Sequence, residues 1–155
     1  MKYSIVIPAY NSGDWIVSLL DAITMEMNKI TKDYEIVVVN DCSPNANTWS
    51  ELVRAATRNT KIKAINLGYN VGQIRALICG IENSSGDFVI TMDDDFQHQP
   101  NQISALINRM NETRADVVIG QYLEKKDTGL RKFGSMLMNT IYFHVYNKPK
   151  HITSN

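Results

Sequence analysis

The chain is 155 residues long, which is enough for one domain with a sizeable buried core. Apolar residues make up 44% of the sequence, and this proportion excludes a disordered chain. Sixteen basic residues balance sixteen acidic ones, so the net charge gives no indication of a nucleic-acid partner.

Apolar runs that suit strands alternate with segments that have helical spacing. The predicted strands cover residues 3–8, 34–40, 61–66, 87–92 and 115–120. The predicted helices cover residues 14–27, 47–57, 70–83 and 101–110. The strands are nearly continuous runs rich in Val and Ile, as expected of strands that are covered on both faces. The alternation predicts an α/β fold with a mostly parallel sheet and helices on both faces.

Two of the predicted helices carry apolar residues at a spacing that defines a face. The first face holds Trp15, Leu19, Ile23 and Met27. The second holds Ile74, Leu77, Ile78 and Ile81, which we expect to be buried.

Polar residues follow the first, second and fourth predicted strands. Asn11 comes after the first strand, Asp41 after the second, and the triplet Asp93, Asp94 and Asp95 after the fourth. In open parallel sheets, ligands bind beyond the carboxyl ends of the strands. We therefore expect these residues to border a binding site.

The aspartate triplet indicates a divalent metal. Two carboxylates about 4 Å apart repel by roughly 4 kcal/mol at an effective dielectric of 20, and a cation would cancel this repulsion. Successive side chains of an extended segment point in opposite directions, so Asp93 and Asp95 would face one side and Asp94 the other. Gln97 shares the phase of the first pair, and such oxygen ligands, completed by a diphosphate, suit Mg²⁺ or Mn²⁺. The alternative is a solvated acidic turn that caps the following helix.

Other sites built from aspartates or glycines fit less well. Phosphatases of the haloacid-dehalogenase type place an Asp-x-Asp pattern after the first strand, whereas here it follows the fourth. The segment IPAYNSG lacks the Gly-x-Gly-x-x-Gly pattern of a dinucleotide site. Gly68 and Gly72 are too sparse for a phosphate loop, and we expect them to shape the entry to the third helix. Cys42 and Cys79 form no spaced motif, which fits a reducing compartment.

Four segments, in order, resemble the family 2 glycosyltransferases, which have the GT-A fold. They are IVIPAYN, EIVVVNDCSPNANT, NLGYNVGQIRALICGIENSSGDFVIT and MDDDFQHQP. The pattern formed by Asp93, Asp95, Gln97, His98 and Pro100 is most similar to that of the dolichyl- and undecaprenyl-phosphate sugar transferases. Two positions depart from the usual Asp-Asp-Gly-Ser loop, since Asn40 replaces the first aspartate and Cys42 the glycine.

The resemblance implies a role for each matching residue. The residues that would hold a UDP- or GDP-linked sugar are Pro8, Ala9, Tyr10, Asn11, Asp41 and Arg75. Asp93, Asp95 and Gln97 would hold Mg²⁺ or Mn²⁺ against the diphosphate. Asp94 would lie with its backbone near the ribose, and its side chain would not be required.

The last part of the sequence is basic and amphipathic. After Lys125 the basic residues are Lys126, Arg131, Lys132, Lys148 and Lys150, against the acidic Asp127. We divide the chain into a nucleotide-sugar-binding core, residues 1–121, and a basic loop with an amphipathic helix, residues 122–155. By resemblance, this second part would begin the acceptor side, with Arg131 near the acceptor phosphate at a membrane surface. An ordinary core helix or a subunit contact is the alternative.

The activity implied is inverting transfer of a sugar from a nucleotide-diphosphate donor to a polyprenyl phosphate. The alternatives are transfer to a saccharide in surface-polysaccharide synthesis, and nucleotide-sugar binding without turnover. Because relatives continue beyond this point, we expect a C-terminally truncated chain whose exposed apolar surface favours a homodimer. We also expect a cytoplasmic protein, at the cytoplasmic face of the membrane in its full-length form, because no signal-peptide pattern follows Met1.

Overall fold

The computed structural model describes residues 1–97 and 99–120. The chain divides into two units, Met1–Val118 and Ile119–Asn155, and every helix and strand given below belongs to the first. His98, Arg131 and the predicted amphipathic helix lie outside the described residues. None of the helices in residues 1–97 and 99–120 has both the length and the apolar content that a bilayer span requires.

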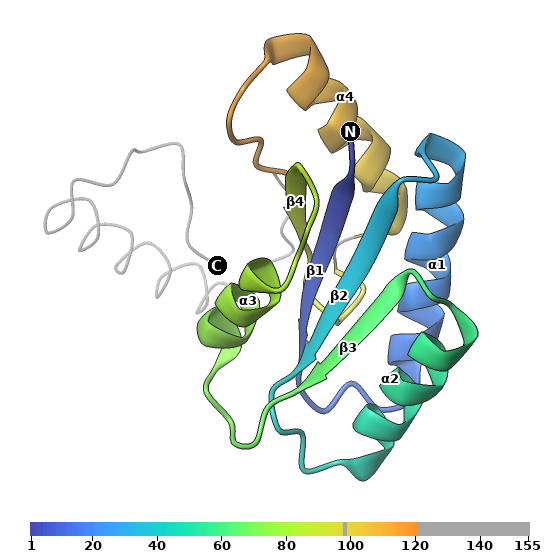
Figure 1. Cartoon of the computed structure of the whole chain (residues 1–155), viewed down its shortest axis with the longest axis vertical. Helices are drawn as coiled ribbons and strands as arrows, with labels where there is room; N and C mark the ends of the chain where they lie inside the picture. The colour runs from blue at the N-terminus through green and yellow to red at the C-terminus, as the bar shows by residue number, and fades with distance from the viewer. Residues whose placement is uncertain (98, 121–155) are drawn as a thin grey trace, which may run out of the picture. The chain divides into compact units, whose positions relative to one another are not determined.

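Four parallel strands form the sheet of the first unit (Figure 1). They are β1 (Tyr3–Ala9), β2 (Tyr34–Asn40), β3 (Ile62–Asn66) and β4 (Phe88–Thr91), in the order β3-β2-β1-β4. All seven residues of β1 are buried, because this strand has a neighbour on each side and helices over both faces. The parallel sheet and the first four predicted strands are confirmed.

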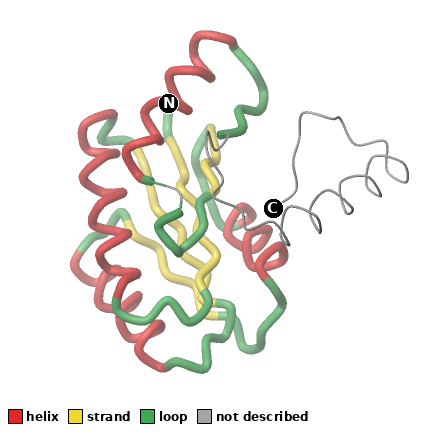
Figure 2. The backbone as a smooth tube through the Cα atoms, turned by 180° about the vertical axis from the view of Figure 1, so that it is seen from behind, coloured by secondary structure: helices red, strands yellow, loops and turns green. Residues whose placement is uncertain are grey.

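The helices cover both faces of the sheet (Figures 1 and 2). They are α1 (Trp15–Ile30), α2 (Ala46–Arg58), α3 (Gln73–Glu82) and α4 (Ile103–Thr113), and a 3-10 turn, η1 (Pro100–Gln102), precedes α4. The larger core joins α1, α2 and α4 to the face of β1 that carries Ile5 and Ile7. The smaller core joins α3 to the opposite face, which carries Val6, Val37 and Val39. Helices on both faces were predicted, and this is confirmed.

The face of α1 was predicted almost correctly. Leu19, Ile23 and Met27 are fully buried, together with Ile16. Trp15, which we placed on the same face, is 51% exposed because it opens the helix beside the loops at the carboxyl end of the sheet.

The face of α3 was predicted wrongly for three of its four residues, since only Leu77 is partly buried against the sheet. Ile74, Ile78 and Ile81 are 74%, 49% and 39% exposed, while Ala76 and Gly80 are buried against the sheet. A β-carbon at Gly80 would lie 2.4 Å from Val6 Cγ1, which is shorter than any normal contact. The backbone of α3 therefore lies so close to the sheet at Ala76 and Gly80 that only small residues fit at these two positions.

The predicted fifth strand, residues 115–120, is not formed. The backbone there has no strand structure, and Val117 and Ile119 are 73% and 70% exposed. β-branched residues favour a strand, but a strand also needs a neighbour that pairs with its backbone. In the described part of the chain, this segment pairs with none.

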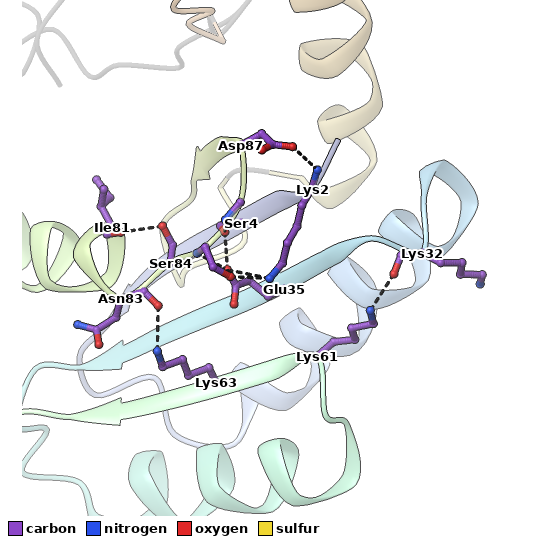
Figure 3. A network of polar contacts seen from close by, with 12 residues as sticks. Lys2, Ser4, Lys32, Glu35, Lys61, Lys63, Ile81, Asn83, Ser84 and Asp87 are labelled. Atoms are coloured by element: carbon purple, nitrogen blue, oxygen red, sulfur yellow. Dashed lines mark hydrogen bonds and ion pairs between the residues drawn. The ribbon is translucent and has the colours of Figure 1, made fainter.

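At the amino ends of the strands, a polar network joins β1, β2 and the segment before β4 (Figure 3). Glu35 Oε1 accepts hydrogen bonds from the Ser4 hydroxyl, at 2.7 Å, and from the backbone N–H and hydroxyl of Ser85. The Lys2 ammonium lies 3.7 Å from the same oxygen. Burial raises the pKa of Glu35, but the hydrogen bonds and Lys2 outweigh it, so the pKa lies below its ordinary value.

Candidate functional site

An open pocket of about 450 Å³ lies beyond the carboxyl ends of the strands. Its lining comes from the segments after β1, β2 and β4 and from the entry to α3. The lining residues are Pro8, Ala9, Tyr10, Asp41, Asn70, Gly72, Gln73, Asp93, Asp94 and Asp95. The volume lies within the range of small-molecule sites. The structure thus brings together seven of the residues that the sequence placed at a nucleotide-sugar site, although they are far apart in the chain.

Asp41 holds the entry to α3. Its side chain is almost fully buried, and its two oxygens accept the backbone N–H groups of Val71, at 2.7 Å, and Gly72, at 2.9 Å. The side-chain amide of Asn70 also donates to the Asp41 carbonyl at 3.2 Å. Free backbone N–H groups at a helix entry are suited to phosphate, but here Asp41 occupies them. Each carboxylate oxygen can still accept one further hydrogen bond from a ligand.

Asp93 and Asp94 point toward different elements. Asp93 Oδ1 accepts a hydrogen bond of 2.7 Å from the side-chain amide of Gln73, in the first turn of α3. Asp94 Oδ2 accepts hydrogen bonds from the backbone N–H of Tyr10, at 3.2 Å, and from the hydroxyl of Ser12. The two neighbours diverge, as the alternation of side chains in an extended segment requires.

Asp95 closes a local turn. Its Oδ1 accepts the backbone N–H of Gln97 at 2.9 Å. Aspartate side chains commonly form such turns by accepting the N–H of the residue two positions later. Phe96, between them, has a φ of 59°. Gln97 is exposed and is not among the residues that line the pocket.

The loops after β1 and β2 are bound to each other. The backbone N–H of Asn11 donates to the Ser43 hydroxyl at 2.9 Å, and Asn11 Oδ1 accepts the N–H of Asn45 at 3.2 Å. Asn40, which stands where the family usually has aspartate, is buried and donates to Asn66 Oδ1 at 2.6 Å. These contacts give Asn11 and Asn40 a scaffold role beside the pocket, and Asn11 does not line it.

The loops after β1, β2 and β4 each contain a non-glycine residue in the left-handed region. These residues are Asn11, Cys42 and Phe96, with φ values of 58°, 52° and 59°. Such residues cluster where a backbone must turn sharply at a functional site. Cys42 stands where the usual loop has glycine, and its positive φ explains why glycine suits that position.

Arg75 is exposed on α3 and is not one of the residues that line the pocket. Its proposed contact with the sugar-nucleotide therefore stays a prediction. Arg131 lies outside the described residues, so its contact with the acceptor phosphate also stays a prediction.

Sequence reasoning missed Asn70 and Gln73, and it gave Ser12 and Trp15 no part in the site. Each of them donates a hydrogen bond from its side chain to a site residue. Asn70 donates to Asp41 and Gln73 to Asp93, while Ser12 and Trp15 donate to Asp94. The signal available was the Asn-Val-Gly-Gln run, because a loop with Gly72 at φ 87° brings the start of α3 toward the pocket. The expectation that Gly72 shapes this entry is confirmed.

Few side chains of the described residues are placed to act as ligands of the predicted metal. Within residues 1–97 and 99–120, no three His, Cys, Asp or Glu side chains are gathered so as to bind a metal ion. The predicted set of ligands relies on two carboxylates, Asp93 and Asp95, which border the same pocket, and on the amide of Gln97. Hard oxygen donors that face an open pocket fit Mg²⁺ or Mn²⁺ with phosphate and water as further ligands.

The chain has an α/β fold with a parallel sheet, and acidic and amide side chains line a pocket beyond the carboxyl ends of its strands. The family model described as "Glycosyl transferase family 2" matches residues 4–154. The chain therefore belongs to glycosyl transferase family 2, as the resemblance indicated.

Curated relatives cover most of the chain. It is 34% identical over 138 residues to an undecaprenyl-phosphate 4-deoxy-4-formamido-L-arabinose transferase of Aeromonas hydrophila, covering 88% of this chain and 41% of that protein. It is 37% identical over 140 residues to the protein of the same name in Yersinia pestis (strain Pestoides F), covering 89% of this chain and 42% of that protein. The chain thus spans about two fifths of the length of these relatives.

Solved structures share the fold. Staphylococcus aureus TarS 1-349 is 24% identical, with a TM-score of 0.61, over 83% of this chain and 40% of that one. The mannosyltransferase PcManGT from Pyrobaculum calidifontis, solved with GDP-Man and Mn²⁺, is 21% identical, with a TM-score of 0.62, over 77% of this chain and 34% of that one. At these identities the likeness establishes the fold, which is the GT-A fold predicted from the motifs.

Proposed function

We propose that this chain is the donor-binding part of an inverting glycosyltransferase that moves a sugar from a nucleotide-diphosphate donor to a polyprenyl phosphate. The observation that carries the proposal is the pocket of about 450 Å³, whose lining includes Asp41, the Asp93–Asp95 triplet and the end of β1 with Tyr10. In this proposal the carboxylates of the triplet serve a metal-bound diphosphate, and Asp41 serves the nucleotide base.

In this proposal Asp93 and Asp95, with Gln97, hold Mg²⁺ or Mn²⁺. Mg²⁺ or Mn²⁺ held there would supply Lewis-acid stabilisation of negative charge on the nucleoside diphosphate. Gln73 keeps Asp93 in place through its 2.7 Å hydrogen bond. PcManGT, which shares the fold and was solved with GDP-Man and Mn²⁺, supports this choice of donor and metal.

The names of the curated relatives, which are undecaprenyl-phosphate sugar transferases, support a polyprenyl-phosphate acceptor. Such a phosphate is already ionised and can attack the anomeric carbon without a base. A saccharide hydroxyl would need a catalytic base, so the alternative of saccharide transfer requires one more residue. The likeness to TarS and PcManGT, at 24% and 21% identity, does not decide between the acceptors.

Because the acceptor named for the relatives is a lipid, we also propose that the full-length protein works at the cytoplasmic face of a membrane. Separation of membrane and soluble fractions, followed by detection of the full-length protein, tests this location. Recovery only in the soluble fraction would contradict it.

Donor binding is tested by thermal unfolding of the chain with UDP and GDP, in Mn²⁺ and in chelator. At a ligand concentration about 100 times its Kd, binding raises Tm by roughly 5–10 °C for a domain of this size. We expect this rise in Mn²⁺ only, and we expect Asp95→Ala to abolish it. A rise of equal size in chelator would contradict the metal-dependent site.

The acceptor is tested with the full-length protein, a labelled nucleotide sugar and undecaprenyl phosphate. Label that passes into the lipid extract supports the proposal. Label that appears only in an added saccharide supports the alternative acceptor. Nucleotide binding without transfer to either would leave a binding protein without turnover.

A further inference from the structure

Asp94 connects the aspartate triplet to the β1–α1 loop. Its carboxylate accepts the Tyr10 backbone N–H, at 3.2 Å, and the Ser12 hydroxyl. Its carbonyl oxygen also accepts the indole N–H of Trp15 at 3.1 Å. Three residues of one segment, residues 10–15, thus donate to a single residue that lies at least 79 positions away in the sequence.

These contacts lie where the sheet no longer joins the two segments. The register of β1 with β4 ends at the pair Val6–Thr91, followed by the Met92 N–H donating to the Val6 carbonyl at 3.1 Å. β1 then continues to Ala9, and its loop forms one side of the pocket with Pro8, Ala9 and Tyr10. The Asp94 contacts therefore link the β1–α1 loop to the triplet beyond the last ladder bond.

The contact between Ser12 and Asp94 is costly to break, because Ser12 is buried. Ser12 is fully buried, so without Asp94 its hydroxyl would have to find another acceptor in the protein interior.

We propose that Asp94 is a positioning residue, whose carboxylate holds the β1–α1 loop against the triplet and thereby sets the width of the nucleotide pocket. Its effect on ligand binding rests on the proposed function. The resemblance alone implied that the Asp94 side chain is not required, and the positioning role replaces that expectation.

The matched variants are Asp94→Asn and Asp94→Ala. Both remove one negative charge, but only asparagine keeps an oxygen that can accept from Tyr10 and Ser12. A difference between them therefore reports the hydrogen bonds and not the charge. Ser12→Ala removes one donor and keeps Asp94, and Asp21→Ala, at an exposed position on α1, serves as the remote control.

The first measurement is amide hydrogen exchange of the chain without ligand. We expect exchange at Tyr10 to speed up about tenfold or more in Asp94→Ala, because its N–H loses its acceptor. Asp94→Asn and Asp21→Ala should leave it unchanged, and exchange within β2 should not respond in any variant. Unchanged exchange at Tyr10 in Asp94→Ala would overturn the proposal, whether or not the protein binds nucleotides.

The second measurement is the Kd for UDP and GDP in Mn²⁺. Asp94→Ala should weaken binding about tenfold, and Asp94→Asn should stay within about twofold of the original chain. Ser12→Ala should also weaken binding. The double variant Ser12→Ala/Asp94→Ala should lose less binding free energy than the sum of the losses of the two single variants.

The two measurements distinguish a failure of the proposed function from a failure of the positioning role of Asp94. If the original chain binds neither nucleotide, the proposed function fails, and the exchange result alone decides whether Asp94 holds the loop. If the chain binds and Asp94→Ala binds as tightly while its loop exchanges faster, the positioning role is overturned. If Asp94→Ala does not fold, Ser12→Ala decides, and a Ser12→Ala chain that binds UDP and GDP as tightly as the original chain overturns the proposal.

Discussion

Cys42 adopts a backbone conformation that an L-amino acid with a side chain disfavours. Its φ of 52° places it in the left-handed region, where residues other than glycine cost about 1–2 kcal/mol. It lies in the loop after β2, directly after Asp41, which is buried and lines the pocket. The departure from the family pattern at this position is therefore tolerated at a local cost in stability.

We predict that Cys42→Gly leaves the free energy of unfolding unchanged or raises it by up to about 1 kcal/mol, because glycine adopts positive φ without strain. Cys42→Val should lower it by about 1–2 kcal/mol, since a β-branched residue is more strongly disfavoured there. Urea unfolding measures both. Cys79→Gly, within the right-handed helix α3, is the matched control and should lose about 1 kcal/mol.

At the scale of elements, α3 shows how a small residue can determine which helix face is buried. Gly80 and Ala76 let the helix backbone lie close to Val6 and Val39, while the isoleucines of α3 face outward. The partly buried Leu77 and Cys79 complete the contact. The apolar pattern alone favoured the larger residues, because spacing records hydrophobicity but not how closely two backbones approach.

Gly80→Ala should lower the free energy of unfolding by about 1–3 kcal/mol, because the added methyl overlaps Val6 Cγ1. This loss should exceed the gain of up to about 1 kcal/mol that alanine brings to a helix interior. Gly68→Ala is the control, since a β-carbon there meets nothing within 4 Å. Equal stabilities of the two variants by chemical denaturation would mean that α3 does not pack as described.

The network at the amino ends of the strands predicts an acid-sensitive contribution to stability. Because the pKa of Glu35 is lowered by folding, its ionised form stabilises the folded state. This contribution is fully present above the ordinary glutamate pKa, about 4.3, and is lost as pH falls through the lowered folded-state pKa. The free energies of unfolding of the original chain and Glu35→Gln should therefore differ at pH 6, and the difference should shrink steadily as pH falls below about 4.

Glu82→Gln, at an exposed position at the end of α3, is the control for Glu35→Gln. It should follow the original chain across the same pH range. A difference between the original chain and Glu35→Gln that stays constant down to pH 2 would contradict the role of the carboxylate charge.

At the scale of the whole molecule, the outer face of α3 is apolar and exposed. Ile74, Ile78 and Ile81 together present this surface on one helix, and such surfaces commonly mark contacts with other parts of a protein or with a second copy. The chain spans about two fifths of its relatives' length, so further segments of the full-length protein are one source of cover. The homodimer expected from the sequence stays a prediction.

For this chain by itself, we predict self-association through α3. Sedimentation velocity should show a dimer whose fraction rises with concentration, and Ile74→Ser with Ile78→Ser should shift it to the monomer. Met25→Ser with Val53→Ser, at exposed positions on α1 and α2, is the matched control and should leave the dimer unchanged. A monomer at all concentrations would remove the homodimer from consideration.

The sequence by itself determined the order of the elements, the parallel sheet and the residues that end each strand at the pocket. These follow from local periodicity and from the rule that parallel strands expose their carboxyl ends at one edge. Asp41 and the triplet Asp93, Asp94 and Asp95 could therefore be placed together from the sequence, and they do line one pocket. The family motifs added the expected ligand, which periodicity cannot supply.

Only the tertiary structure decided which partners those residues take. The bond from Gln73 to Asp93, the loop held by Asp94 and the burial of Gly80 all depend on distances between segments that are remote in the chain. The absence of a strand at residues 115–120 has the same cause, because pairing needs a neighbour and not only a suitable sequence. Local patterns state what each segment can form, and packing between segments selects among those possibilities.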